Sequence, residues 1–140
     1  MKQPAASEPL REHPNALRIR ALLAAFRERD LAAIQAAIPE HAVWHFPGRQ
    51  GALAGSHAGR GAILAFLGQV VALTQGSFHL ELEDVIASDR SAAVFFRGHA
   101  TRAGRTLDNP TCLRMRIEAG QIVEIWEFVW DLHAVDAFWA

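Results

Sequence analysis

The fold is decided by residues 77–130, SFHLELEDVIASDRSAAVFFRGHATRAGRTLDNPTCLRMRIEAGQIVEIWEFVW. At its start the apolar residues Phe78, Leu80 and Leu82 alternate with polar ones. This period of two is typical of a strand with one buried face. Ala103-Gly104 and Ala119-Gly120 have the composition of tight turns between antiparallel strands. We therefore predict a four-stranded antiparallel meander, whose strands begin at Phe78 and then run over Ser91–Thr101, Arg105–Glu118 and Gln121–Trp130.

Upstream of the meander the apolar spacing is helical. Ile63, Phe66, Leu67 and Val70 fall at i, i+3, i+4 and i+7, which predicts a helix over residues 62–73. Two earlier helices are predicted: one from residue 15, with an apolar stripe that includes Phe26, and a short one over residues 31–38. Residues 42–46 have the composition of a strand, and the glycine-rich residues 48–61 that of a loop.

Helices that precede a block of strands indicate the α+β class. We predict a curved antiparallel sheet wrapped around three N-terminal helices, followed by a short C-terminal helix over residues 132–138. Pro4 and Pro9 lie among polar residues, so residues 1–13 are expected to form a flexible tail. Residues 14–140 are expected to form one domain, since their number suits a single hydrophobic core.

Composition excludes several classes of protein. Hydrophobic residues make up 51% and charged residues 21% of the 140 residues, as in an ordinary globular domain. A net charge of −1 gives no long-range attraction to nucleic acid or an anionic membrane. The single cysteine, Cys112, can form neither an internal disulfide nor a zinc-binding thiolate cluster. With no apolar signal-peptide region in residues 1–14 and no membrane-length apolar run, we expect a cytoplasmic protein.

Alternation also divides the meander into two faces. The face expected to lie under the helices collects Phe78, Leu80, Leu82, Val94, Phe96, Gly98, Leu113, Met115, Ile117, Trp126, Phe128 and Trp130. The opposite face collects Glu81, Glu83, Arg97, His99, Arg114, Arg116 and Glu127. A bulge in any strand would invert every assignment beyond it.

Several stretches resemble one known family. They are Val43-Trp44-His45-Phe46-Pro47-Gly48, residues 53–61 with the helix that follows, Gly120–Trp126 and Asp131–Trp139. With the order of elements from residue 15 onward, they resemble the SnoaL-like branch of the nuclear transport factor 2-like superfamily. The resemblance implies the cystatin-like cone of ketosteroid isomerases, in which a curved sheet encloses a deep pocket. It further implies an apolar or aromatic small-molecule ligand, no metal or organic cofactor, and a homodimer through the convex face of the sheet.

Two residues are candidates for catalysis by this resemblance. His45 lies on the first strand, where epoxide-hydrolase relatives place polar residues; if Val43 and His45 face the cavity, Trp44 faces away. A histidine there could act as a general acid or base, although a histidine bonded to a backbone carbonyl is an equal alternative. Asp131 follows the last strand, where related enzymes have an acid, but helix-terminus rules favour an N-cap.

The pocket itself is expected to be apolar. The expected ligand-binding residues are Val43, Phe26, Leu67, Phe96, Leu113, Met115, Trp126, Phe128 and Trp130. The chain has no tyrosine, which ketosteroid isomerases use to hold the oxyanion, and Phe128 stands where the epoxide-hydrolase pattern needs an aspartate. Both of these activities are therefore disfavoured. Three hypotheses remain: an isomerase, cyclase or dehydratase acting on an apolar cyclic substrate, a non-catalytic ligand-binding domain, and a dimerisation domain whose cavity is filled by its own tryptophans.

Overall fold

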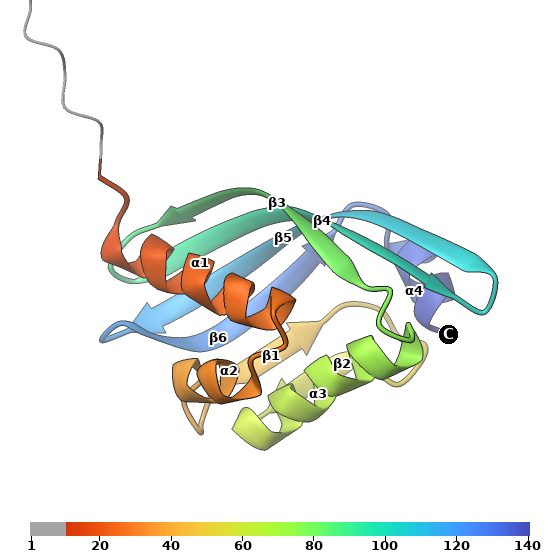
Figure 1. Cartoon of the computed structure of the whole chain (residues 1–140), viewed down its shortest axis with the longest axis horizontal. Coiled ribbons are helices and arrows are strands. Elements are labelled where there is room, and N and C mark those ends of the chain that lie inside the picture. Colours follow the sequence, from red (N-terminus) through yellow and green to blue (C-terminus); the bar gives the residue numbers. More distant parts are fainter. Residues whose placement is uncertain (1–10) are drawn as a thin grey trace, which may run out of the picture.

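A computed structural model describes residues 11–140 of the chain (Figure 1). These residues form four helices and six strands, and the α+β class is confirmed. The helices are α1 (Pro14–Arg27), α2 (Leu31–Ala37), α3 (Arg60–Leu73) and α4 (Leu132–Trp139). The strands are β1 (Val43–Phe46), β2 (Gly55–Ala58), β3 (His79–Ala87), β4 (Ser91–Arg102), β5 (Arg105–Glu118) and β6 (Gln121–Val129).

The strands form one sheet in the order β2-β1-β6-β5-β4-β3. The predicted meander β3–β6 is antiparallel throughout, whereas β1 pairs with β6 in parallel. The segment expected to be a loop, residues 48–61, contains the edge strand β2, which pairs with β1. That expectation was wrong because Gly55-Ser56-His57-Ala58 carries no apolar alternation, and its strand conformation comes from pairing with β1.

The helices and the sheet enclose the core. Helices α1, α2 and α3 lie along one face of the curved sheet, and α4 packs near the far ends of β4 and β5 (Figure 1). The α1 side of the core gathers apolar residues such as Ile19, Val94 and Met115, and the α3–α4 side gathers Phe66 and Phe138. The predicted arrangement of three N-terminal helices against a curved sheet, with a short C-terminal helix, is therefore present.

A β-bulge in the last hairpin reverses the predicted faces of β6. The register passes from Ile117↔Ile122 to Arg116↔Glu124, so that one additional residue, Val123, lies on β6. Beyond this point Val123, Ile125 and Glu127 face the helices. The expectation that Trp126, Phe128 and Trp130 lie inside and Glu127 outside was therefore wrong for all four residues.

The predicted tail is only partly described, because residues 1–10 lie outside the described residues. Glu12 accepts hydrogen bonds from Arg20 at 2.7 and 2.9 Å, and His13 lies 2.8 Å from Asp89. The contacts of the domain thus begin before residue 14. None of the helices formed by residues 11–140 has the length and hydrophobicity that crossing a bilayer requires.

Candidate active site

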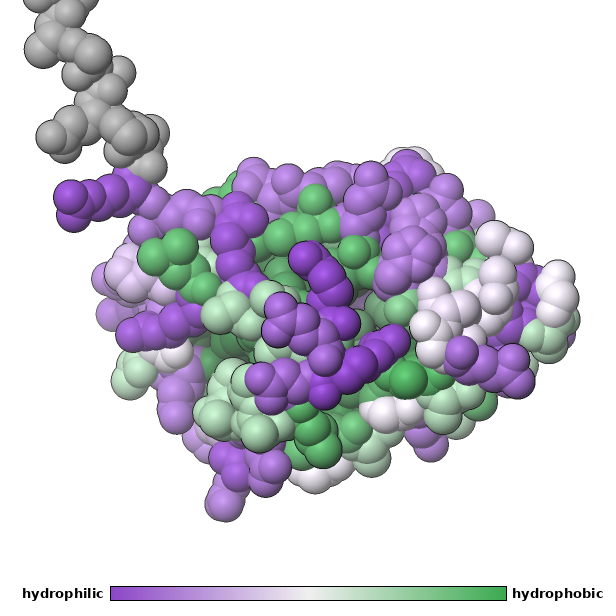
Figure 2. All heavy atoms as spheres, in the orientation of Figure 1, coloured by the Kyte–Doolittle hydropathy of each residue, from purple (hydrophilic) through white to green (hydrophobic). Residues whose placement is uncertain are grey.

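A cavity lies between the sheet and helices α1–α4. Its walls are almost wholly apolar, and its volume is about 90 Å³. Since about 10–15 Å³ holds one water, this volume holds several waters; it lies below the roughly 300–1,000 Å³ of typical small-molecule pockets, so a ring compound requires the cavity to widen. Figure 2 shows hydrophobic residues in the hollow between the helices, with hydrophilic side chains at its rim.

Five of the predicted ligand-binding residues line this cavity: Phe26, Leu67, Phe96, Leu113 and Met115. The other four do not. Val43 lies on the opposite face of β1 from Trp44 and Phe46, which both line the cavity. Trp126, Phe128 and Trp130 are on the convex face of the sheet because of the bulge in β6, and Phe128 and Trp130 are 54% and 85% exposed. These aromatic residues therefore do not fill the cavity.

Glu127 is the ionisable residue that lines the cavity. It projects inward from β6 directly opposite Leu113 of β5. Glu127 as a whole residue is partly exposed, whereas its carboxyl group is desolvated by the apolar side chains around it. This burial raises the pKa of Glu127 to about 8, against a smaller opposing effect of the hydrogen bond from Trp44. That bond joins Trp44 Nε1 to Glu127 Oε1 at 3.3 Å.

Two further polar residues line the cavity from β5. Asn109 and Thr111 are 7% and 6% exposed. The Nδ2 group of Asn109 donates to Thr111 Oγ1 at 2.9 Å, and the Thr111 hydroxyl donates to the main-chain oxygen of Asn109 at 3.2 Å. The buried Oδ1 of Asn109 has no hydrogen-bond partner among residues 11–140. The apolar wall of the cavity therefore carries one carboxyl group, and within that wall Asn109 holds a buried acceptor without a partner.

His45 lies outside the cavity, so the expectation that it faces inward was wrong. It pairs in register with Trp126, and their rings stack on the convex face with centroids 5.6 Å apart. Its Nε2 lies 2.6 Å from Glu124 Oε2, and its Nδ1 lies 2.7 Å from Ser56 Oγ. A carboxylate can only accept, so Nε2 carries the proton shared with Glu124. The hydrogen bond from His45 is the main cause that lowers the pKa of Glu124.

Asp131 caps α4. Its Oδ1 accepts a hydrogen bond from Ala134 N at 3.0 Å, which satisfies one of the free amides of the helix start. The carboxyl group is exposed and does not line the cavity. Of the two interpretations of this residue, the structure supports the N-cap.

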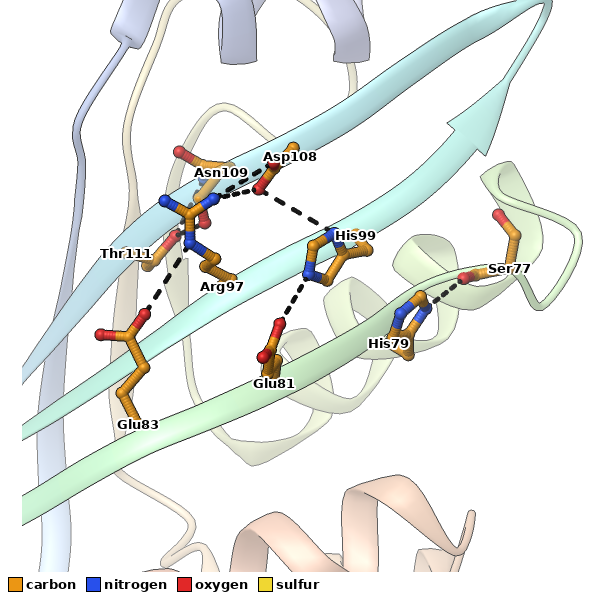
Figure 3. A network of polar contacts seen from close by, with 9 residues as sticks. All are labelled: Ser77, His79, Glu81, Glu83, Arg97, His99, Asp108, Asn109 and Thr111. Carbon is orange, nitrogen blue, oxygen red and sulfur yellow. Dashed lines mark hydrogen bonds and ion pairs between the residues drawn. The ribbon is translucent and has the colours of Figure 1, made fainter.

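The charged residues of β3, β4 and β5 form a network on the convex face (Figure 3). Arg97 Nη1 donates to Asp108 at 3.0 Å and Arg97 Nε lies 3.9 Å from Glu83, while His99 Nε2 lies 3.2 Å from Glu81. As predicted from alternation, Arg97 and His99 lie outside, and Phe96 and Gly98 line the cavity. Cys112 is also on the convex side, and burial raises the pKa of its thiol, which disfavours the reactive thiolate.

Sequence reasoning missed Glu127, Asn109, Thr111 and the inward face of Trp44. One signal for Glu127 was present: Ile122 and Val123 are adjacent apolar residues directly after a turn, and both are buried. Two successive buried residues in an otherwise alternating strand indicate a bulge. Counting inward positions from Val123 then places Ile125 and Glu127 inside.

One protein family matches more than half of the chain. The family described as SnoaL-like domain matches residues 19–125. The uncharacterized protein Rv0034 of Mycobacterium tuberculosis is 32% identical over 123 residues, which cover 87% of this chain and 93% of the relative. The structure of Bal32a, from a soil-derived mobile gene cassette, has a TM-score of 0.86 at 35% identity and covers 90% of this chain and 96% of its own.

A second solved structure, a protein of unknown function from Xanthomonas campestris, has a cystatin-like fold. Its TM-score is 0.84 at 27% identity, over 91% of this chain and 99% of its own. The predicted cone fold is thereby confirmed.

Proposed function

Because the chain belongs to the family of SnoaL-like domains, we propose that it binds an apolar cyclic molecule in the cavity and transfers a proton on it through Glu127. The observation that carries this proposal is the single carboxyl group of Glu127 on an otherwise apolar wall. A desolvated carboxyl group in a cavity is typical of a general acid or base, because burial brings its pKa close to neutral pH. The reaction class is that of an isomerase, cyclase or dehydratase that needs no cofactor.

The ionised form of Glu127 is the base. It removes a proton from a carbon next to a carbonyl group of the ligand, which leaves an enolate and a neutral Glu127. The neutral carboxyl group then returns its proton to the same or another carbon. With a pKa of about 8, both forms of Glu127 are populated near neutral pH. The indole N–H of Trp44 donates to the carboxyl group and so favours its ionised form.

Proton exchange into two-ring ketones tests this proposal. We would incubate 1-tetralone and 2-tetralone with the protein in deuterium oxide and follow deuterium at the carbon next to the carbonyl, after subtraction of the uncatalysed rate. The wild type should accelerate exchange, and Glu127→Gln should reduce that acceleration by about 10²-fold or more. The control variant is Glu83→Gln, which changes a carboxyl group on the convex face. Equal exchange by wild type and Glu127→Gln would contradict the proposal.

The second candidate is a ligand-binding domain without chemistry. It is favoured by the placement of Arg97 and Asp108, which form an ion pair on the convex face and supply no charge to the cavity. Tight binding of a ketone with no exchange above background would favour this alternative.

We also propose that the chain forms a homodimer through the convex face. A row of side chains crosses this face in register, from Phe95 on β4 through Cys112 on β5 to Phe128 on β6. In the neighbouring row Trp126 is stacked between the ring of His45 and the guanidinium of Arg114, 4.8 Å from its ring. Aromatic residues and arginine are enriched in protein interfaces, which supports burial of these rows against a second copy.

A further inference from the structure

We infer that Asn109 is a specificity-determining residue, whose free Oδ1 selects ligands that carry a hydroxyl group at the end of the cavity away from Glu127. This inference rests on the proposed small-molecule function of the cavity and adds the chemical class of its ligand. The ligand is an apolar ring compound with a hydroxyl donor, such as a phenol or a ring alcohol. Three features of the structure lead to it.

The first feature is the fixed orientation of the Asn109 amide. The Thr111 hydroxyl donates its hydrogen bond to the main-chain oxygen of Asn109, at 3.2 Å. The Thr111 hydroxyl oxygen can then only accept a further hydrogen bond, and it accepts one from Asn109 Nδ2 at 2.9 Å (Figure 3). The amide therefore directs Nδ2 to Thr111 and leaves Oδ1 as a buried acceptor without a partner among residues 11–140. A buried acceptor without a donor destabilises the fold, and a ligand hydroxyl would remove this cost.

The second feature is the space beside Asn109. Gly98 lies directly opposite Asn109 in the pairing of β4 with β5, and both line the cavity. Its φ is not in the left-handed region, so the backbone does not require glycine here. A glycine inside a strand often marks the close approach of a ligand. A Cβ at this position would meet Phe78 at 3.4 Å and Phe96 at 3.8 Å, which are ordinary van der Waals contacts, so the missing side chain leaves room for about a methyl group beside these two rings.

The third feature is the separation of the two polar groups. Asn109 is four residues from Leu113, which is paired directly with Glu127. At about 3.4 Å per residue this is about 14 Å along β5. The wall between them carries Thr111 and, paired with it on β4, Phe96. A molecule that uses both groups must therefore be elongated, with its hydroxyl and its reacting carbon at different ends of an apolar ring system.

Binding of two nearly isosteric probes tests the role of Asn109. We would measure the binding of 2-naphthol and 2-methylnaphthalene by equilibrium dialysis; the two probes differ by a hydroxyl in place of a methyl group. The wild type should prefer 2-naphthol, beyond the preference set by their hydrophobicity, by about 3- to 10-fold. Asn109→Leu, which keeps the shape of the side chain, should abolish this preference, whereas Glu127→Gln should retain it. Gly98→Ala should weaken the binding of both probes, because its methyl group takes the space beside Phe78 and Phe96.

Three outcomes would overturn the inference, and they separate it from the proposed function. If 2-naphthol is not preferred, or if Glu127→Gln rather than Asn109→Leu abolishes the preference, the role of Asn109 is refuted while the cavity remains a binding site. If neither probe binds, the proposed small-molecule function of the cavity fails as well.

Thermal stability without ligand gives an independent readout. Asn109→Leu should raise Tm by about 2–5 °C, because it removes an acceptor that has no donor. The matched control is Thr74→Val, since Thr74 is 2% exposed and its hydroxyl donates to Val70 O at 2.7 Å. Loss of that satisfied hydrogen bond should lower Tm. A fall in Tm for both variants would show that Asn109 is satisfied structurally and would contradict the inference.

Discussion

The indole nitrogen of Trp44 on β1 lies 3.3 Å from a carboxyl oxygen of Glu127 on β6, inside a cavity that is otherwise almost wholly apolar. The two residues belong to neighbouring parallel strands, in which Trp44 pairs with Ile125. Strand pairing thus brings one donor to a carboxyl group that burial holds largely protonated at neutral pH. The predictions below follow from this arrangement and from the placement of the other candidate residues.

Glu127 should make the protein less stable as pH rises. Its pKa is about 8 in the folded state, against an ordinary value of 4.5. The folded state therefore binds one more proton than the unfolded state between these values, and the free energy of unfolding falls by about 1.4 kcal/mol per pH unit there. Glu127→Gln should remove this contribution. Denaturant titrations at pH 5, 7 and 9 measure it as the difference between wild type and variant, and a difference that does not change with pH would refute it.

Trp44→Phe should raise the pKa of Glu127 above the wild-type value. The variant keeps an aromatic ring against Phe66 but loses the N–H that stabilises the ionised carboxylate. The midpoint of the pH dependence of deuterium exchange should move upward accordingly. Trp126→Phe is the control, because Trp126 lies on the convex face and should leave the midpoint unchanged. A downward movement for Trp44→Phe would show that the indole does not favour the ionised form.

His45→Ala should leave deuterium exchange within about twofold of the wild type, because His45 is outside the cavity. Its effect should be on stability. The pKa of Glu124 is lowered mainly by His45, so the stabilisation is present above the ordinary value of 4.5 and is lost as pH falls through the lowered pKa. For this partly exposed pair we expect a loss below about 1 kcal/mol at pH 6 that disappears in acid. A large loss of exchange activity would instead restore His45 as a catalytic residue.

Asp131→Ala should reduce the free energy of unfolding by about 0.5–2 kcal/mol, as expected for the loss of an N-cap. Asp131→Asn keeps an oxygen that can accept from Ala134 N, and should retain most of the stability. Both variants should exchange deuterium at the wild-type rate. If Asp131→Asn loses activity while it remains stable, the carboxylate itself has a chemical role.

Phe128→Arg should shift the proposed homodimer toward monomer, because it places a charge in the apolar row of the convex face. The control is Leu17→Arg on α1, where the side chain is similarly exposed, at 55% against 54% for Phe128. Sedimentation equilibrium should detect dissociation in the first variant alone. An unchanged mass for Phe128→Arg, or a monomeric wild type, would contradict assembly through this face.

The fold could be predicted from the sequence because its strong signals are local. The spacing of Ile63, Phe66 and Val70 defines α3, and alternation with two tight turns defines β3–β6. β2 could not be predicted, since its four residues are polar or small and gain their conformation from β1. The parallel pairing of β1 with β6 is a contact between distant segments that no local pattern indicates.

The candidate site was harder to predict because one residue, Val123, decides which side chains of β6 face the cavity. Trp126 and Phe128 on β6, with Trp130 just beyond it, alternate as large aromatic residues, and this alternation alone assigns them to the interior. The bulge at Val123 reverses this order and turns Glu127 inward. The strand β1 pairs with β6 beyond the bulge, so that Trp44 lies beside Ile125 on the cavity side and His45 beside Trp126 on the convex side. Phe96, Leu113 and Met115 were predicted correctly as lining residues because β4 and β5 pair without a register shift, and Phe26 and Leu67 because they belong to the apolar stripes of helices.

The most direct test of the account is the titration of the Glu127 carboxyl group itself. We would label glutamate with carbon-13 at the side-chain carboxyl, assign the Glu127 resonance by its absence in Glu127→Gln, and follow its chemical shift from pH 4 to pH 10. The account predicts a midpoint at about 8. A midpoint near the ordinary value of 4.5 would mean that Glu127 is solvated and ionised at neutral pH, and would contradict its role as the proton-transferring group of an apolar cavity.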